Sequence, residues 1–249
     1  MKTIGINTLV YKNDLEAGKS QAQLCVEVAK YSTVIEVRRE FIKRVEEFDE
    51  IRKEAKNNAL EVYYSIPEKI TINKALHPQF YTFLSEAKRM CATHIKFNMG
   101  DLHSCDTQVI QDLNKIMKDY QIFITIENDQ TKENGTLDCA KSTFTHLKSH
   151  GSKIGFTYDA GNWYWQNESP MNAFDIMKSY IQVYHLKNVK VNPYLRTVLL
   201  EEGCITWKSM IDMLSDEVTI ILEYPMCKKD IHHEVQCLKN AIQGGNIYE

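Results

Sequence analysis

The sequence has little of several features that would place it in a special class of protein. It contains only 10 glycines and 5 prolines among 249 residues, which excludes a collagen-like or low-complexity chain. Its charges nearly balance, with 33 Asp and Glu against 30 Lys and Arg and a net charge of −3, which argues against binding to nucleic acid through gross charge. We therefore expect no nucleic-acid partner.

Long apolar runs and paired cysteines are also absent from the sequence. No stretch is long enough to cross a bilayer, and the first residues, MKTIGINTLVYK, are too polar for the apolar part of a signal peptide. The 7 cysteines are odd in number and form no CxxC motif. We predict a cytoplasmic protein without a membrane partner, whose cysteines are reduced thiols in the core.

Eight apolar segments of strand length alternate with segments of helical periodicity along the whole chain. In the helical segments an apolar residue recurs every three or four positions, which places these residues on one buried face. Two of the predicted helices span 104–120 and 206–215. The alternation is typical of parallel βα units. The predicted strands span 3–9, 33–38, 59–65, 93–98, 121–127, 153–159, 181–187 and 218–223.

The predicted fold is an α/β protein, a single-domain (β/α)8 TIM barrel that spans residues 1–249. Eight strands and eight helices in strict alternation close naturally into such a barrel, whose usual length is about 250 residues. A doubly wound open sheet is the competing topology. The sequence contains no linker rich in Pro, Gly or Ser and no internal repeat, so we expect one domain rather than two.

Four ionisable residues in the second half stand at the ends of predicted strands. Glu127, Asp159, His185 and Glu223 follow one another at spacings of 32, 26 and 38 residues, each about one βα unit. A lone histidine in an apolar strand is more often a core residue than a ligand. Four such residues at one mouth favour a site, because converging carboxylates repel one another unless a cation lies between them. We predict one divalent metal ion: Mn²⁺, Mg²⁺, Co²⁺ or Zn²⁺.

The segments around these residues resemble a known family. They are similar to the xylose isomerase-like TIM barrels, a group of sugar and sugar-phosphate isomerases and epimerases that also includes the AP endonuclease 2 branch. The likeness spans most of the chain and is specific from Glu127 onward. It implies that the four residues named above hold one metal ion. Gly203 and Trp207 match the family's loop before the last helix-strand unit. The similar segments are IFITIENDQT, IGFTYDAGNWYW, VYHLKNVK, VLLEEGCITWKSMI and IILEYP.

The sequence departs from two branches of this family. The endonuclease branch holds three zinc ions with additional histidines, and this chain has Ser65, Asn98 and Asn162 in the corresponding places. Ketohexose epimerases also carry a histidine where Asn162 stands and an arginine soon after the metal-binding histidine, whereas the nearest arginine here is Arg196. These departures argue against a three-zinc endonuclease and leave the substrate open.

The resemblance implies proton transfer next to a carbonyl group. Glu127 and Glu223 act as the acid/base pair in this scheme, and the metal stabilises the enediolate that forms between the two transfers. We predict a metal-dependent isomerase or epimerase of a sugar, sugar phosphate or keto-polyol, with a role in carbohydrate metabolism. There are two alternatives. One is a metal-dependent dehydratase (a lyase) of a keto-polyol, and the other is a non-catalytic sugar-binding barrel.

Further polar residues near the strand ends are candidates for binding the small carbohydrate substrate. Lys187 lies two residues beyond His185 and therefore on the same strand face. The same alternation aligns Glu36 with Arg38. A solvated surface position is the alternative for each of these charges. The predicted substrate-binding residues are Lys187, Asn162, Arg196, Asn98, Lys96, Glu36, Arg38 and Trp163.

An aromatic run follows the predicted ligand Asp159. Trp163, Tyr164 and Trp165 stand in a loop where an aromatic ring can stack on a sugar and exclude water. The same residues can pack against a second subunit instead. We assign Trp163 to the substrate and Trp165 to a subunit contact, and a homodimer is an expectation taken from the family.

Overall fold

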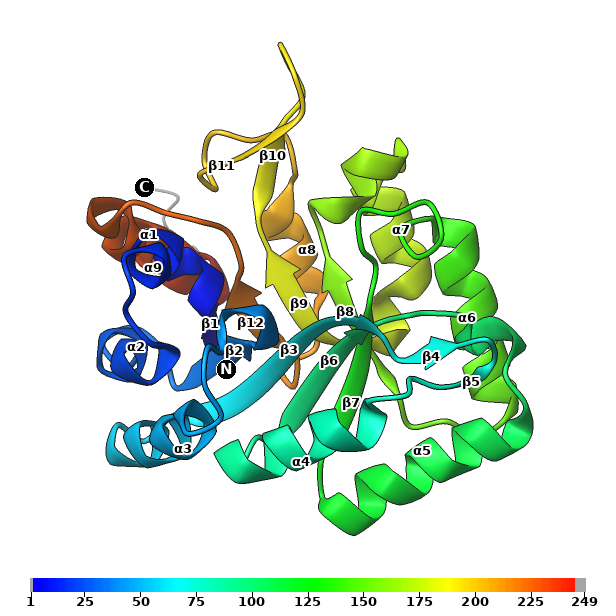
Figure 1. Cartoon of the computed structure of the whole chain (residues 1–249). Coiled ribbons are helices and arrows are strands. Elements are labelled where there is room, and N and C mark those ends of the chain that lie inside the picture. The colour runs from blue at the N-terminus through cyan, green and yellow to red at the C-terminus, as the bar shows by residue number, and fades with distance from the viewer. Residues whose placement is uncertain (1, 245–249) are drawn as a thin grey trace.

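Eight parallel strands form a closed barrel in the computed structural model, which describes residues 2–244 (Figure 1). The barrel strands are β1 (Ile4–Asn7), β2 (Val34–Arg38), β3 (Glu61–Lys69), β6 (His94–Asn98), β7 (Phe123–Glu127), β8 (Gly155–Asp159), β9 (Ile181–Leu186) and β12 (Thr219–Leu222). Their order around the barrel is β1-β12-β9-β8-β7-β6-β3-β2. The first strand pairs with the last, Ile4 opposite Ile220. The predicted single-domain TIM barrel is therefore confirmed, and the open sheet is excluded.

The strand ends differ from the prediction mainly in β3. This strand continues to Lys69 instead of ending at residue 65, and its pairing with β6 shifts register between Ser65 and Lys69. The additional stretch contains Pro67, which cannot donate a hydrogen bond and which therefore argues against a strand on sequence grounds. The irregular register explains how the strand accommodates it.

Helices between the strands cover the outside of the barrel (Figure 1). The helix α5 is typical: Ile110, Leu113 and Ile116 are buried on one face, and the helix ends at Tyr120 because Gln121 is left-handed with φ 50°. Among residues 2–244, none of the helices has the length and apolar character needed to cross a membrane. The helices are α1 (Lys12–Glu16), α2 (Gln21–Val28), α3 (Glu47–Asn57), α4 (Phe80–Met90), α5 (Thr107–Tyr120), α6 (Leu137–Ser149), α7 (Pro170–Met177), α8 (Trp207–Met213) and α9 (Lys228–Ile242).

Two short hairpins interrupt the alternation of strands and helices, and the sequence did not predict them. One joins β4 (Thr71–Ile72) to β5 (Ala75–Leu76) after β3. The other joins β10 (Asn188–Lys190) to β11 (Arg196–Val198) directly after β9. Figure 1 shows the β10–β11 hairpin in yellow, projecting from the body of the barrel.

Burial of the cysteines is mixed. Cys25 and Cys105 are buried, but Cys91, Cys204 and Cys227 are exposed. The prediction that the cysteines are core residues is therefore wrong for these three. Cys91 lies at the left-handed end of α4, where the chain turns at the surface.

The barrel interior becomes more polar toward the mouth formed by the strand C-termini. Residues two apart on a strand point to the same side, so Thr125 and Glu127 both face inward. Near the bottom, the hydroxyls of Thr125 and Thr157 are 2.6 Å apart, and the Nε2 atom of His94 is 2.8 Å from Thr125 Oγ1. Two residues further along these strands, the hydroxyls give way to charged groups. The alternation thus collects ionisable side chains at one end of the barrel.

Candidate metal centre

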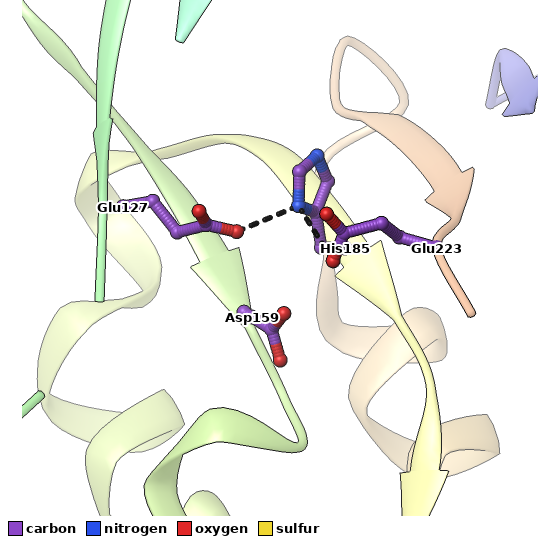
Figure 2. A group of neighbouring side chains, drawn as sticks. All are labelled: Glu127, Asp159, His185 and Glu223. Atoms are coloured by element: carbon purple, nitrogen blue, oxygen red, sulfur yellow. Dashed lines mark hydrogen bonds and ion pairs between the residues drawn. The ribbon is translucent and has the colours of Figure 1, made fainter. Parts of the chain in front are cut away.

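Four ionisable side chains meet inside the mouth of the barrel (Figure 2). One ligand atom from each of Glu127, Asp159, His185 and Glu223 lies within 4.8 Å of the others, and all four residues are buried. They come from the C-terminal ends of β7, β8, β9 and β12, which are neighbours in the barrel. The structure therefore brings together the residues that the strand ends singled out.

The donor set fits a divalent ion. Carboxylate oxygens and imidazole nitrogens bind Zn²⁺ or Mg²⁺ at about 2.0–2.2 Å, so two ligands on opposite sides of an ion stand about 4.2 Å apart. The 4.8 Å spread of the four ligand atoms exceeds this by only about half an ångström. Rotation of the side chains is enough to close such a difference.

The orientation of His185 also suits a ligand. Its Nδ1 atom is 2.8 Å from Glu127 Oε1 and 3.5 Å from Glu223 Oε2, so this nitrogen faces the other candidate ligands. Its Nε2 atom is 3.0 Å from Glu36 Oε2, and Glu36 accepts a hydrogen bond from the amide of Asn7. Metal-binding histidines commonly donate their second ring nitrogen to a carboxylate in this way. Glu36 therefore orients the imidazole from the side opposite the candidate ligands.

Each of the three ligand carboxylates contacts a cationic side chain as well. Such pairs form because an ionised group without a partner is costly in the interior. The ion pairs, each 2.6 Å between nitrogen and oxygen, join Lys96 to Glu127, Lys187 to Asp159 and Arg38 to Glu223.

These cations keep two of the carboxylates ionised. Burial raises the pKa of Glu127, but the charges of Lys96 and His185 outweigh burial and lower the pKa to about 2. Burial likewise opposes ionisation of Glu223, and the charges of His185 and Lys187 hold its pKa well below the usual value. Both carboxylates are therefore ionised at neutral pH.

The pKa values of Asp159 and His185 shift in the opposite direction, upward. Burial raises the pKa of Asp159 to about 7, although Lys187 opposes the shift. Burial lowers the pKa of His185, but the carboxylates around it, Glu36 first, raise the pKa well above its usual value. His185 is therefore protonated in this structure, and coordination through Nδ1 requires release of that proton.

A tight turn after β8 fixes Asp159. Its Oδ1 atom accepts hydrogen bonds of 2.9 Å from the backbone amides of Gly161 and Asn162. Asn128, the residue after Glu127, accepts from the amide of Asp159 and donates to its carbonyl. Asn162 in turn donates to the carbonyl of Asn128. Asn162 thus supports the turn from within, and Asn128 is a positioning residue that the strand-end pattern did not single out.

Lys187 reaches Asp159 by passing over a glycine. A Cβ atom added to Gly161 would lie 2.7 Å from Cγ and 2.8 Å from Cε of Lys187. A larger residue at position 161 would therefore push the lysine side chain away from Asp159. In the sequence, the signal for this close approach is the glycine two residues after Asp159.

The remaining substrate-binding candidates divide into two groups. Asn98 ends β6 directly opposite Glu127 in the strand register and is half-buried near the ligands. Trp163, in contrast, is fully buried, with ring centroids 6.5 Å from Phe156 and 5.6 Å from Tyr158. It packs beside the barrel strand β8, not over the mouth.

Arg196 also lies apart from the ligand group. It belongs to β11, and its guanidinium donates to the carbonyls of Asn192 and Tyr194 within the same hairpin. The structure thus does not bring Arg196 to the candidate ligands. A residue from the first strand, Asn7, takes part instead through Glu36.

Comparison with protein families shows to which family the chain belongs. The family model described as Xylose isomerase-like TIM barrel matches residues 68–241, which include all four candidate ligands. The chain belongs to this family. No curated protein matches the sequence of this xylose isomerase-like barrel.

Solved structures of similar fold cover nearly the whole chain. The probable 3-DHS dehydratase AsbF from Bacillus anthracis is 17% identical, with TM-score 0.68 and coverage of 96% of this chain and 99% of its own. D-psicose 3-epimerase, solved in the presence of D-fructose, is 18% identical with TM-score 0.64 and 97% coverage of both chains. A xylose isomerase-like TIM barrel protein from Mycobacterium smegmatis in complex with magnesium is 14% identical, with TM-score 0.68 and coverage of 97% and 98%. At these identities the likeness shows the fold.

Proposed function

We propose that this protein is a divalent-metal-dependent isomerase or epimerase of a sugar, sugar phosphate or keto-polyol, with Glu127 and Glu223 as its acid/base pair. One observation carries the proposal. Both carboxylates border the same nitrogen, His185 Nδ1, at 2.8 Å and 3.5 Å, and they extend from two different strands. A substrate bound at this mouth would therefore lie near both carboxylates.

The side chains divide the work of proton transfer. One ionised glutamate removes a proton from the carbon next to the carbonyl and later releases it to water. The other glutamate first takes up a proton from water or from a substrate hydroxyl and then returns that proton to carbon. Return to the opposite face of the same carbon inverts that centre, and return to the neighbouring carbon isomerises the substrate. Lys96 and Arg38 hold the two carboxylates in place through their ion pairs. A divalent ion held by Glu127, Asp159, His185 and Glu223 would supply Lewis-acid stabilisation of the developing negative charge.

Family membership and the neighbouring structures support this class of reaction. The neighbours include a D-psicose 3-epimerase and a probable dehydratase, two activities that can begin with the same proton abstraction. Product analysis separates them, because a dehydratase forms a conjugated carbonyl compound that absorbs ultraviolet light.

The test combines metal analysis with hydrogen exchange. We expect about one divalent ion per purified chain, and deuterium uptake from heavy water into at least one member of a panel of ketoses, ketose phosphates and keto-polyols. Glu223→Gln should reduce the uptake by about 100-fold or more. The control is Glu217→Gln, an exposed glutamate just before β12, which should leave uptake unchanged. Absence of metal after repletion with Mn²⁺, Co²⁺ and Zn²⁺, or exchange that persists in Glu223→Gln, would contradict the proposal.

A further inference from the structure

Two cations, Arg38 and Lys187, contact candidate ligands at the barrel mouth. Arg38 lies two residues beyond Glu36 at the end of β2, and Lys187 lies two residues beyond His185, directly after the last residue of β9. Glu36 and His185 contact one another at 3.0 Å, so they mark one level of the barrel interior. Two residues further toward the mouth, a cation follows each of them in the sequence.

Building on the proposed function, we propose that the substrate carries an anionic group, a carboxylate or a phosphate, and that Arg38 and Lys187 bind it. This assigns the protein to acidic carbohydrates such as sugar acids or sugar phosphates and not to neutral ketoses. The argument rests on where the cations lie, how deeply they are buried and which groups neutralise them.

Burial makes both cations depend on an anionic partner. The side chains of Arg38 and Lys187 are only 15% and 9% exposed. Water therefore stabilises their charges weakly, and each needs a negatively charged group in contact. Their partners at the mouth are Glu223 and Asp159, which are themselves candidate metal ligands.

A carboxylate that shares its charge with a divalent ion neutralises a neighbouring cation less completely. When Glu223 and Asp159 serve the ion, Arg38 and Lys187 keep a positive charge that the hydroxyls of a neutral sugar cannot balance. A carboxylate or phosphate on the substrate can, through charge-assisted hydrogen bonds. Glu40 also contacts Arg38, at 2.6 Å from Nε, but its side chain is 34% exposed, where water screens its charge.

The net charge of the buried groups with a divalent ion bound also favours an anionic substrate. Four carboxylates face three cations, and His185 is neutral as a ligand. A divalent ion then leaves the buried cluster with one net positive charge, which an anionic substrate complements. The carboxylates are those of Glu36, Glu127, Asp159 and Glu223, and the cations are those of Arg38, Lys96 and Lys187.

Lys96 has a different place. It pairs with Thr125 in the strand register, two residues before Glu127, and its side chain is 3% exposed. It therefore reaches Glu127 from below the ligands and serves as that carboxylate's counter-ion. The anion-binding pair is restricted to the two cations on the mouth side.

The test uses three probes that share one carbon skeleton: D-fructose, D-fructose 6-phosphate and D-fructuronate, the corresponding 6-carboxylate. Each is titrated calorimetrically into the full-length protein loaded with Mn²⁺. We expect at least one anion to bind about tenfold more tightly than D-fructose. The phosphate and carboxylate arms show which anion the site takes.

Variants of Arg38 and of its neighbour Arg39 test whether Arg38 causes the preference for the anion. Arg38→Gln should remove the preference for the anion over D-fructose, while Arg38→Lys should keep part of the preference. The control is Arg39→Gln, because Arg39 pairs with Glu86 outside the barrel interior. Binding of all three probes with equal affinity, binding of neither anion, or an anion preference that survives in Arg38→Gln would overturn the proposal.

The two proposals can fail separately. Deuterium exchange that occurs only on neutral ketoses would leave the proposed function standing and overturn the anionic substrate. Anion binding that depends on Arg38, together with exchange that persists in Glu223→Gln, would do the reverse.

Discussion

Glu36 Oε2 lies 3.0 Å from His185 Nε2, so a carboxylate from β2 holds the imidazole whose other nitrogen faces the candidate ligands. Glu36 is 1% exposed, and Asn7 donates a hydrogen bond to it. This contact joins the first half of the barrel to a ligand set that comes from the second half.

Removal of the negative charge at Glu36 should weaken metal binding. We expect Glu36→Gln to lower the affinity for the divalent ion by about 10- to 100-fold, because the imidazole loses both orientation and basicity. Competition with a fluorescent chelator measures the affinity. The control is Glu40→Gln, which changes a glutamate on the outer side of Arg38 and should leave the metal affinity nearly unchanged. Equal effects of the two substitutions would argue against a positioning role for Glu36.

Metal binding should release a proton at neutral pH. His185 is protonated without metal, because the surrounding carboxylates raise its pKa, and its Nδ1 must be free to coordinate. The affinity should therefore fall as pH decreases. Calorimetry in buffers of different ionisation enthalpy should show at least one proton released per ion, from His185 and from the protonated fraction of Asp159. Proton release below about half a proton at pH 7 would contradict this assignment.

The contact of Gly161 with Lys187 should appear as a coupling between substitutions. Gly161→Ala should destabilise the protein by about 1–3 kcal/mol, because the new methyl group collides with the lysine stem. In a Lys187→Ala background the collision disappears, so the same change should cost much less. Urea unfolding of the wild type and the three variants gives the coupling. Additive effects would show that the glycine serves another purpose.

Stability should also depend on pH through His94. Burial lowers the pKa of this histidine from 6.5 to about 4 in the folded protein. The unfolded chain therefore takes up the proton first, and stability falls as pH drops from about 6.5 to about 4. Between pH 7 and pH 5 this loss is about 2 kcal/mol. Urea unfolding at both values should show a smaller loss for His94→Gln; parallel curves would exclude His94 as the cause.

Much of the architecture was predictable because two simple periodicities run through the chain. Alternation of strand and helix patterns indicated the barrel, and every predicted barrel strand is present. The same logic placed Glu127, Asp159, His185 and Glu223 at strand ends, where the closed barrel brings them within 4.8 Å. Parallel strands of one barrel end at the same mouth, so the local pattern was sufficient for this convergence.

Contacts between distant strands were not predictable in the same way. The alternation shows that Glu36 and Lys96 face inward, but the stagger of the strands decides that one contacts His185 and the other Glu127. Trp163 packs inside, and Arg196 turns back on its own hairpin, because neighbouring loops decide where such side chains lie.

The sequence by itself thus determined the barrel and the set of ionisable groups at its mouth, since both follow from local periodicity and from the closure of parallel strands. Only the tertiary structure decided which cation neutralises which carboxylate and which cations stand on the substrate side. These pairings depend on the height of each residue in a tilted barrel and on the reach of flexible side chains, and neither is encoded in the spacing along the chain.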